Sequence, residues 1–206
     1  MSGSPLFLAP LRTEALAVHR GAPRAALERI GMGPVRASAA CARLVRSEPG
    51  RPLVLLGFAG ALDPEVGAGD LVVASSCLAE DGGEPLVLPE AATVAQLLGA
   101  AGLTPRVHLG PILSTPRVLR GSPARSAGLK GGGLAVDMES RWCAPLARTH
   151  PFAVVRAVVD VPGHEVFSLA TPLATWRAFK ALAAAAAVLR EWSPVRLDEK
   201  CKVGDR

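Results

Sequence analysis

The sequence has no tyrosine, few other aromatic residues and no cluster of basic residues. Aromatic residues make up 4% of the chain, which leaves little from which to build the base-stacking surfaces of single-strand nucleic-acid binders. The formal charge of +5 comes from arginines scattered along the whole chain. Because nucleic-acid binding needs clustered positive charge, we expect no nucleic-acid partner.

Cysteine is also scarce, and its spacing argues against two kinds of site. Zinc sites and redox motifs depend on closely spaced Cys and His residues. No Cys-x-x-Cys pair and no histidine at ligand spacing accompanies the four cysteines, which are Cys41, Cys77, Cys143 and Cys201. We therefore expect no metal and four reduced thiols.

Long hydrophobic runs are missing as well. The longest stretch without a charged residue, Ala91–Pro105, is too short and too polar to cross a bilayer. The N-terminus leads directly into an apolar run and lacks the basic region and small-residue cleavage site of a secretory signal. We expect a cytoplasmic protein without stable membrane insertion.

The chain does have enough apolar sequence for a large core. Hydrophobic residues make up 50% of its 206 residues, a length common for one α/β domain. The charged segment 193–206 shows no periodicity, so we expect one domain over residues 1–192 followed by a disordered tail. Short apolar runs bounded by Gly, Pro and Asp alternate with Ala/Leu-rich segments of helical length, which predicts a layered α/β fold.

The predicted strands are continuous apolar runs, a pattern typical of strands buried on both faces. They are Leu6–Ala9, Leu27–Ile30, Leu53–Leu56, Asp70–Ser75, Val107–Leu109, Gly133–Val136 and Phe152–Val159. Helices are predicted at Leu11–His19, Pro34–Ser47, Glu90–Ala101, Met138–Thr149 and Pro172–Trp192, and loops at Pro49–Pro52, Ala79–Pro89 and Gly128–Gly133. In the last helix the predicted core contacts recur at helical spacing, at Trp176, Phe179, Leu182 and Leu189.

Three acidic residues, Glu14, Glu139 and Asp160, closely follow apolar runs or close one. Ligands of open α/β sheets bind outside the carboxyl ends of the strands, so these residues are the first candidates for a site. Each also has a purely structural interpretation, in a helix first turn or at the start of a turn. Arg156 lies inside an apolar run and would need a nearby anion, since an unpaired buried charge is costly.

Glycines follow the predicted strand Leu53–Leu56 and are expected to form a turn that lets the backbone approach a ligand closely. Gly57 and Gly60 do not follow the Gly-x-Gly-x-x-Gly order of dinucleotide-binding loops. The sequence therefore gives little support to a dinucleotide cofactor.

Five segments carry motifs that occur in the same order in one known superfamily. They are Ile30–Pro34 (G-[IM]-G), Gly57–Pro64 with Gly69–Ser75 (G-x-A-G-G-L-x-P…G-D-[IV]-V-V), Ala135–Ser140 (V-[DE]-M-E) and Val155–Asp160 (V-R-[AG]-[IV]-S-D). In this combination the chain resembles the purine nucleoside phosphorylase and nucleosidase superfamily. The resemblance extends from Leu6 to Leu189, nearly the whole chain.

This resemblance implies a single-domain three-layer sandwich with a mixed central β-sheet, which cleaves the bond between a nucleobase and ribose without a cofactor. Glu14 matches the carboxylate that activates water, and Asp160 the residue that delivers a proton to purine N7. Arg156 matches a buried arginine that organises the first carboxylate. The implied substrate-binding residues near the ribose, the base and the 5′ group are Ala59, Gly60, Val118, Leu119, Val136, Met138, Glu139 and Phe167.

Independently of the resemblance, cleavage of an N-ribosidic bond requires a similar pair of carboxyl groups. Breaking an N-ribosidic bond develops positive charge on the sugar and negative charge on the departing base. An acid near the base and an ionised carboxylate near C1′ stabilise these charges. We expect Asp160 to be the acid and Glu14 the base, with a neighbouring cation keeping Glu14 ionised.

Three departures from the family pattern bear on the substrate. Val159 stands where Ser is usual, Phe58 where a small polar residue is frequent, and Val118 where methylthioadenosine and adenosylhomocysteine nucleosidases carry an aromatic residue. They count against methylthioadenosine and adenosylhomocysteine as substrates. A narrower resemblance, to phosphorylase-like proteins associated with hopanoid biosynthesis, is carried by Pro10–Ala15 with Gly31–Pro34, by Val136–Ser140 and by Val159–His164. That resemblance implies release of adenine from an adenosyl-hopane, with Phe167 in an apolar wall around the 5′ group.

Two other functions stay open. Phosphorolysis would need phosphate as co-substrate, and no phosphate motif surrounds the available arginines, Arg12, Arg36, Arg117 and Arg120. A nucleoside-binding protein without catalysis is also compatible with the fold. In all three cases we expect a small-molecule nucleoside partner and a homodimer, because pockets of this family are usually completed by a neighbouring subunit.

Overall fold

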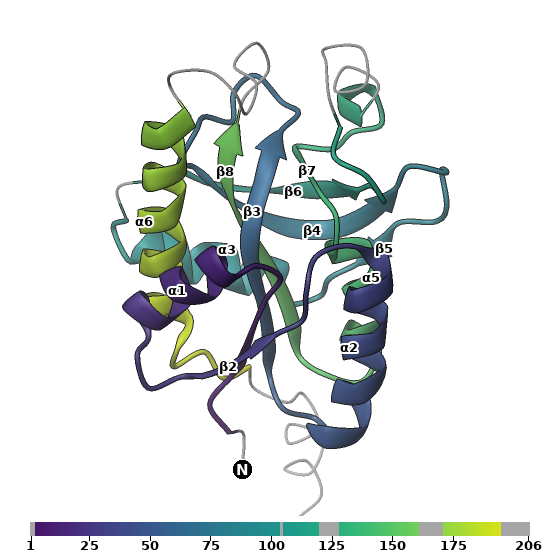
Figure 1. Cartoon of the computed structure of the whole chain (residues 1–206), viewed down its shortest axis with the longest axis vertical. Helices are drawn as coiled ribbons and strands as arrows, with labels where there is room; N and C mark the ends of the chain where they lie inside the picture. The colour runs from purple at the N-terminus through teal and green to yellow at the C-terminus, as the bar shows by residue number, and fades with distance from the viewer. Residues whose placement is uncertain (1–2, 104, 120–127, 161–170, 195–206) are drawn as a thin grey trace, which may run out of the picture.

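The computed structural model describes residues 3–103, 105–119, 128–160 and 171–194 (Figure 1). Its strands are β1 (Leu6–Ala9), β2 (Ala26–Arg29), β3 (Leu53–Ala61), β4 (Leu71–Ala79), β5 (Leu86–Val87), β6 (Val107–Ser114), β7 (Ala135–Asp137) and β8 (Phe152–Asp160). Its helices are α1 (Arg12–Gly21), α2 (Pro34–Ser47), α3 (Ala91–Ala100), α5 (Ser140–Cys143), the 3-10 helix η1 (Ala144–Arg148) and α6 (Thr171–Leu189).

The strands form one mixed sheet in the order β2-β1-β3-β7-β6-β4-β5, and β8 pairs with both β3 and β4. Pairing is parallel between β1 and β3 and between β3 and β8, but antiparallel between β3 and β7 and between β4 and β8. The parallel strands β1, β3 and β8 therefore end at the same edge of the sheet, where a ligand site is expected.

Helices cover both faces of the sheet, with α1, α3 and α6 on one side and α2 and α5 on the other (Figure 1). The predicted three-layer sandwich with a mixed sheet is confirmed. Strand β8 supplies much of the core, since all its residues except the half-buried Val159 are buried. No helix in the described ranges is long and apolar enough to cross a membrane.

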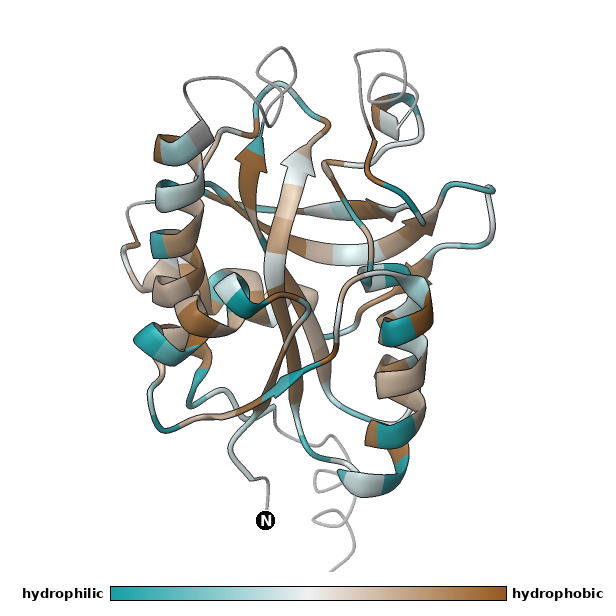
Figure 2. Ribbon diagram, viewed as in Figure 1, coloured by the Kyte–Doolittle hydropathy of each residue, from teal (hydrophilic) through white to brown (hydrophobic). Residues whose placement is uncertain are grey.

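Strand β3 corrects the prediction of a glycine turn after Leu56. It continues through Gly57 and Gly60 to Ala61, and its pairing with β8 sets Gly57 opposite Arg156. Figure 2 shows this strand turning from brown to pale at about its middle. A side chain at Gly57 would overlap Nη1 of Arg156, so glycine is required here by a close approach rather than by a turn.

Other boundaries were predicted wrongly. Strands β4 and β6 extend beyond their predicted ends, β5 lies inside a predicted loop, and residues 128–130 are helical. The helix predicted at Met138–Thr149 is instead the short α5 followed by η1, where Pro145 has no N–H to continue an α-helix. Trp176, a predicted core residue of α6, is 56% exposed, whereas Leu182 and Leu189 are buried as predicted.

Candidate active site

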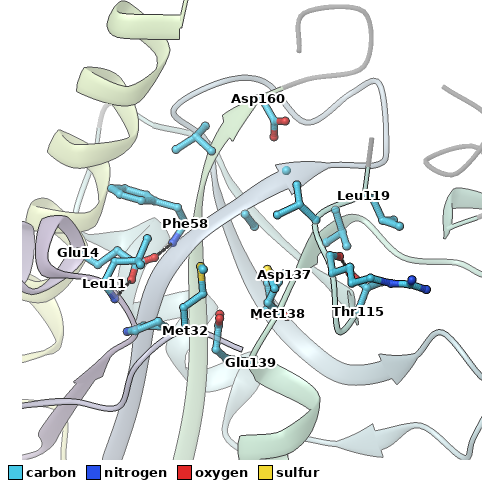
Figure 3. Close-up of a pocket in the computed structure, with 17 residues that line it drawn as sticks. Leu11, Glu14, Met32, Phe58, Thr115, Leu119, Asp137, Met138, Glu139 and Asp160 are labelled. Carbon is cyan, nitrogen blue, oxygen red and sulfur yellow. Dashed lines mark hydrogen bonds between the residues drawn. The ribbon is translucent and has the colours of Figure 1, made fainter. Parts of the chain in front are cut away.

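A cavity lies beyond the ends of β1 and β8, against the last residues of β3 and of the antiparallel strand β7 (Figure 3). Nearly all of the predicted site residues line it, namely Glu14, Ala59, Gly60, Val118, Leu119, Val136, Met138, Glu139 and Asp160. Arg156 lies behind the wall and is fully buried, and Phe167 lies outside the described residues. Segments more than 140 residues apart in the sequence thus meet in one place.

The cavity has two parts that differ in character. We call Glu14, Glu139 and the buried residues behind them, Asp137 and Arg156, the inner end. Both glutamates are at most 4% exposed. We call the partly exposed apolar residues at the rim the mouth. They are Leu11, Met32 and Val118, which are 36%, 46% and 56% exposed.

Glu14 lies in the first turn of α1, and two backbone N–H groups hold its carboxyl group. The N–H of Leu11 donates to its Oε2 at 2.6 Å, and the N–H of Phe58 donates to its Oε1 at 2.7 Å. Burial raises the pKa of Glu14, while the charge of Arg156 and the two N–H groups lower it only in part. The cation therefore acts on Glu14 in the expected direction, but desolvation opposes it and outweighs it.

Glu139 lies just before α5 and is tied to the start of α2. The N–H of Gly33 donates to its Oε1 at 2.9 Å, and Nη2 of Arg156 lies 3.4 Å from its Oε2. Burial, and less strongly the like charge of Asp137, raise the pKa of Glu139 to about 7, although the positive charge of Arg156 acts to lower it. Its carboxyl group therefore changes charge near neutral pH.

Arg156 has the nearby anion that its burial requires. Its Nη2 forms an ion pair of 2.5 Å with Oδ2 of Asp137, and Nη2 and Nε both donate to Oγ of Ser140. Its Nη1 is buried and has no hydrogen-bond partner among the residues that the structure describes. The predicted influence of Arg156 on Glu14 is present as a charge effect, since Arg156 lowers the pKa of Glu14.

Asp160 ends β8 and lies apart from the inner end. It is buried, lines the cavity, and stands well separated from Glu139 in the view of Figure 3. The two carboxyl groups of Glu14 and Asp160 therefore reach the same cavity from different strands and helices. Such separation allows two carboxyl groups to take different protonation roles.

Sequence reasoning missed several residues of the cavity wall. They are Pro10, Leu11, Met32, Thr115, Arg117 and Asp137, beside the motif departures Phe58 and Val159. Met32 and Asp137 lie inside motifs already noted, and the polar Asp137 in an apolar run was a usable signal. Arg117 had been considered only as an arginine available for phosphate, and Thr115 carried no signal, since it follows β6 at a point that only the longer strand reveals.

No group of three or more His, Cys, Asp or Glu side chains in the described ranges could hold a metal. Cys41, Cys77 and Cys143 are buried free thiols, and Cys201 lies outside the described residues.

Comparisons with known proteins agree with this geometry. The model of the phosphorylase superfamily matches residues 11–190. The chain therefore belongs to the phosphorylase superfamily, as the motifs predicted.

The chain is also similar to individual proteins, in sequence or in structure. The 5′-methylthioadenosine/S-adenosylhomocysteine nucleosidase of Mycobacterium bovis is 26% identical, with 69% of this chain and 71% of that protein covered. Two solved structures share the fold. The nucleosidase of the same name from Campylobacter jejuni has a TM-score of 0.76 at 16% identity, covering 92% of this chain and 99% of its own. Futalosine hydrolase of Helicobacter pylori has a TM-score of 0.71 at 14% identity, covering 89% and 93%.

Proposed function

We propose that this protein is a nucleosidase that hydrolyses the N-ribosidic bond of a purine nucleoside, with adenine as the base. The observation that carries the proposal is the single cavity into which two buried carboxyl groups, Glu14 and Asp160, reach from different elements. A third carboxyl group, Glu139, lies at the inner end with Met138 beside it. The nucleosidase name of the mycobacterial relative supports the same reaction class.

In the proposed reaction, Glu14 takes a proton from water while the water oxygen bonds to C1′ of the ribose. The C1′–N bond breaks, and its electron pair goes to the purine, which receives a proton at N7 from Asp160. Glu139 accepts hydrogen bonds from the ribose hydroxyls. A pKa raised by burial suits Glu14 for this work, because a base is most effective when its pKa approaches the working pH.

The proposal extends to a substrate with an apolar group at the 5′ position, as in an adenosyl-hopane. The apolar mouth supports it, since Leu11, Met32 and Val118 offer partly exposed apolar side chains. The cavity itself has a volume of about 170 Å³, below the roughly 300–1,000 Å³ of pockets for drug-sized ligands. A long 5′ group would therefore lie along the mouth, where burial of apolar surface favours apolar cargo.

The same exposed mouth supports a homodimer, because a second subunit would cover its apolar side chains. Light scattering at micromolar concentration tests this part of the proposal. A monomer would contradict it.

The reaction is tested by incubating the protein with adenine, guanine, hypoxanthine and uracil nucleosides, with and without phosphate, and measuring the free base. We expect adenine release that does not depend on phosphate. Turnover only with phosphate would replace hydrolysis by phosphorolysis. Binding without release of base from any 5′-substituted adenosine would indicate a non-catalytic binding protein.

The 5′ preference is tested with adenosines whose 5′ group lengthens from hydroxyl to methylthio to long alkyl. We expect kcat/KM to rise along this series, by up to a few kcal/mol in transition-state stabilisation for a fully buried chain. A flat or falling series would exclude the apolar 5′ substrate while leaving the nucleosidase reaction intact.

A further inference from the structure

Asp137, the last residue of β7, is a buried carboxylate whose two oxygens are both engaged. Oδ1 accepts the hydroxyl of Ser114 at 2.5 Å, and Oδ2 accepts the hydroxyl of Ser140. The N–H of Ser140 donates to the same carboxylate at 3.2 and 3.3 Å. Its side chain is 1% exposed, so these bonds hold it without competition from solvent.

This carboxylate fixes the orientation of Arg156. Nη2 meets Oδ2 of Asp137 at 2.5 Å, and the hydroxyl of Ser140 accepts from both Nε and Nη2 of the guanidinium. A guanidinium is planar, so fixing Nε and Nη2 also fixes the direction of Nη1. Nη1 is left facing Gly57, and a Cβ at Gly57 would overlap Nη1 while lying 2.9 Å from Oε1 of Glu14.

We propose that Asp137 is a positioning residue, which together with Ser114 and Ser140 holds Arg156 between Glu139 and Glu14 and thereby sets the charge of both glutamates. The role in catalysis rests on the nucleosidase function proposed above. Asp137 acts through Arg156, so it takes no part in the proton transfers themselves.

The balance of charge at the inner end supports this role. One guanidinium, from β8, faces three carboxyl groups, Asp137 of β7, Glu139 between β7 and α5, and Glu14 of α1. The thiols of Cys77 on β4 and Cys143 on α5 also face the cluster. Burial raises the pKa of Cys77, and a hydrogen bond with Cys41 together with burial raises that of Cys143.

Three buried carboxylates against one cation carry excess negative charge, which is costly in a low dielectric. The charge of Asp137 contributes to raising the pKa of Glu14 and of Glu139. Asp137 therefore has two opposed effects on the glutamates: it places their shared cation, and it favours their protonation.

The decisive variant is Asp137→Asn, which keeps the shape and removes the charge. We follow the carboxyl carbons of ¹³C-labelled glutamate in the free protein by NMR during a pH titration, with Glu139→Gln and Glu14→Gln to assign the signals. We expect the titration midpoint of Glu139 to fall by about one pH unit, the lower end of the effect of a neighbouring charge. The amide oxygen can still accept hydrogen bonds from Ser140 and Arg156, so the variant isolates the effect of the charge, and an unchanged or raised midpoint would overturn the proposal.

Activity gives the second measurement. The acid limb of kcat/KM against pH should move to lower pH in Asp137→Asn by a similar amount, which loss of folded protein alone would not produce. The control is Asp70→Asn, which removes a buried carboxylate paired with Arg106 and His108 away from the cavity. It should leave both the NMR midpoint and the pH profile unchanged, and a matching shift in this control would overturn the proposal.

Ser140→Ala keeps the proposal testable if Asp137→Asn does not fold. It removes the hydroxyl that joins Asp137 to Arg156 but keeps every charge. We expect kcat to fall at least about tenfold, the loss of one buried charge-assisted hydrogen bond, and the Glu139 midpoint to rise, because Arg156 is then held less firmly beside Glu139. An unchanged kcat would overturn the proposal. If the wild-type protein releases no base at all, the nucleosidase function fails, while the NMR titration still decides the role of Asp137.

Discussion

The inner end and the mouth of the cavity are built in opposite ways. At the inner end, Arg156 is 0% exposed and each carboxyl group is held by named donors from distant parts of the chain. At the mouth, Leu11, Met32 and Val118 keep a third or more of their surface exposed. Buried ionic contacts fix geometry, whereas exposed apolar residues tolerate change. Under the proposed function, this contrast predicts that the inner end carries the chemistry and the mouth the choice of substrate.

The largest effect on this contrast is expected when the cation of the inner end, Arg156, is removed. Arg156→Ala leaves Asp137 and Glu139 buried without their partner, so we expect the free energy of unfolding to fall by about 3–5 kcal/mol. Urea denaturation measures it. As a control, Arg190→Ala removes an exposed arginine paired with Glu191 and should change stability by less than about 1 kcal/mol. Equal losses in the two variants would contradict the contrast.

A second test removes the negative charge of Glu14, the proposed general base, while keeping the shape of its side chain. Glu14→Gln should lower kcat by about 10²–10⁴-fold, the usual contribution of a general base. The Kd of a non-hydrolysable nucleoside analogue should stay within a few-fold. Glu28→Gln, on the edge strand β2 and paired there with Arg43, is the matched control and should keep full turnover. Unaltered turnover in Glu14→Gln would remove Glu14 from the mechanism.

The inner end should also make stability depend on pH. The pKa of Glu139 is raised to about 7 in the folded protein, so the folded state binds its proton more tightly than the unfolded state does. This contribution to stability is complete below the ordinary pKa of 4.5 and is lost as pH rises through about 7, a loss of a few kcal/mol at most. Urea denaturation from pH 4.5 to 8 should show the decline, and Glu139→Gln should flatten it. A wild-type profile that rises over this range would contradict the raised pKa.

The smallest expected effect belongs to the mouth. Met32→Ala should lower kcat/KM for a long 5′-alkyl adenosine by about five- to tenfold, the loss of part of a buried methionine contact, and leave adenosine itself unaffected. Val45→Ala, which trims an equally exposed side chain of α2 away from the cavity, should change neither substrate. If adenosine were affected as strongly as the alkyl substrate, the mouth would serve the chemistry as well.

The same contrast explains what the sequence could predict. Arg156 stood out because a charge interrupts an apolar run, and the V-D-M-E and V-R-A-V-V-D motifs marked both strands that carry the inner end. The partner of Arg156 was missed, because the sequence around Asp137 does not show that β7 and β8 lie close enough in the fold for the two side chains to form an ion pair. The residues of the mouth were missed for another reason. Isolated apolar residues such as Leu11 and Met32 look the same whether they enter a core or line a rim.

The predicted strand boundaries are wrong where local sequence preferences and tertiary contacts disagree. Gly57 and Gly60 are typical of turns, and Gly110 with Pro111 suggested an end to β6, yet pairing with neighbouring strands carries β3 and β6 onward. Trp176 shows the opposite error, since helical spacing placed it in the core and the structure leaves it 56% exposed beside Lys180.

The close approach at Gly57 sets a limit on how this protein can vary. A strand interior usually accepts many residue types, because side chains alternate between two faces with room on at least one. At Gly57 the space of a methyl group is already occupied by the guanidinium of Arg156, with the carboxylate of Glu14 at its border. Any other residue there would have to displace the sheet or the ion cluster. Position 57 is thus closed to substitution, so under the proposed function a change of substrate would have to arise at the mouth while the inner end stays as it is.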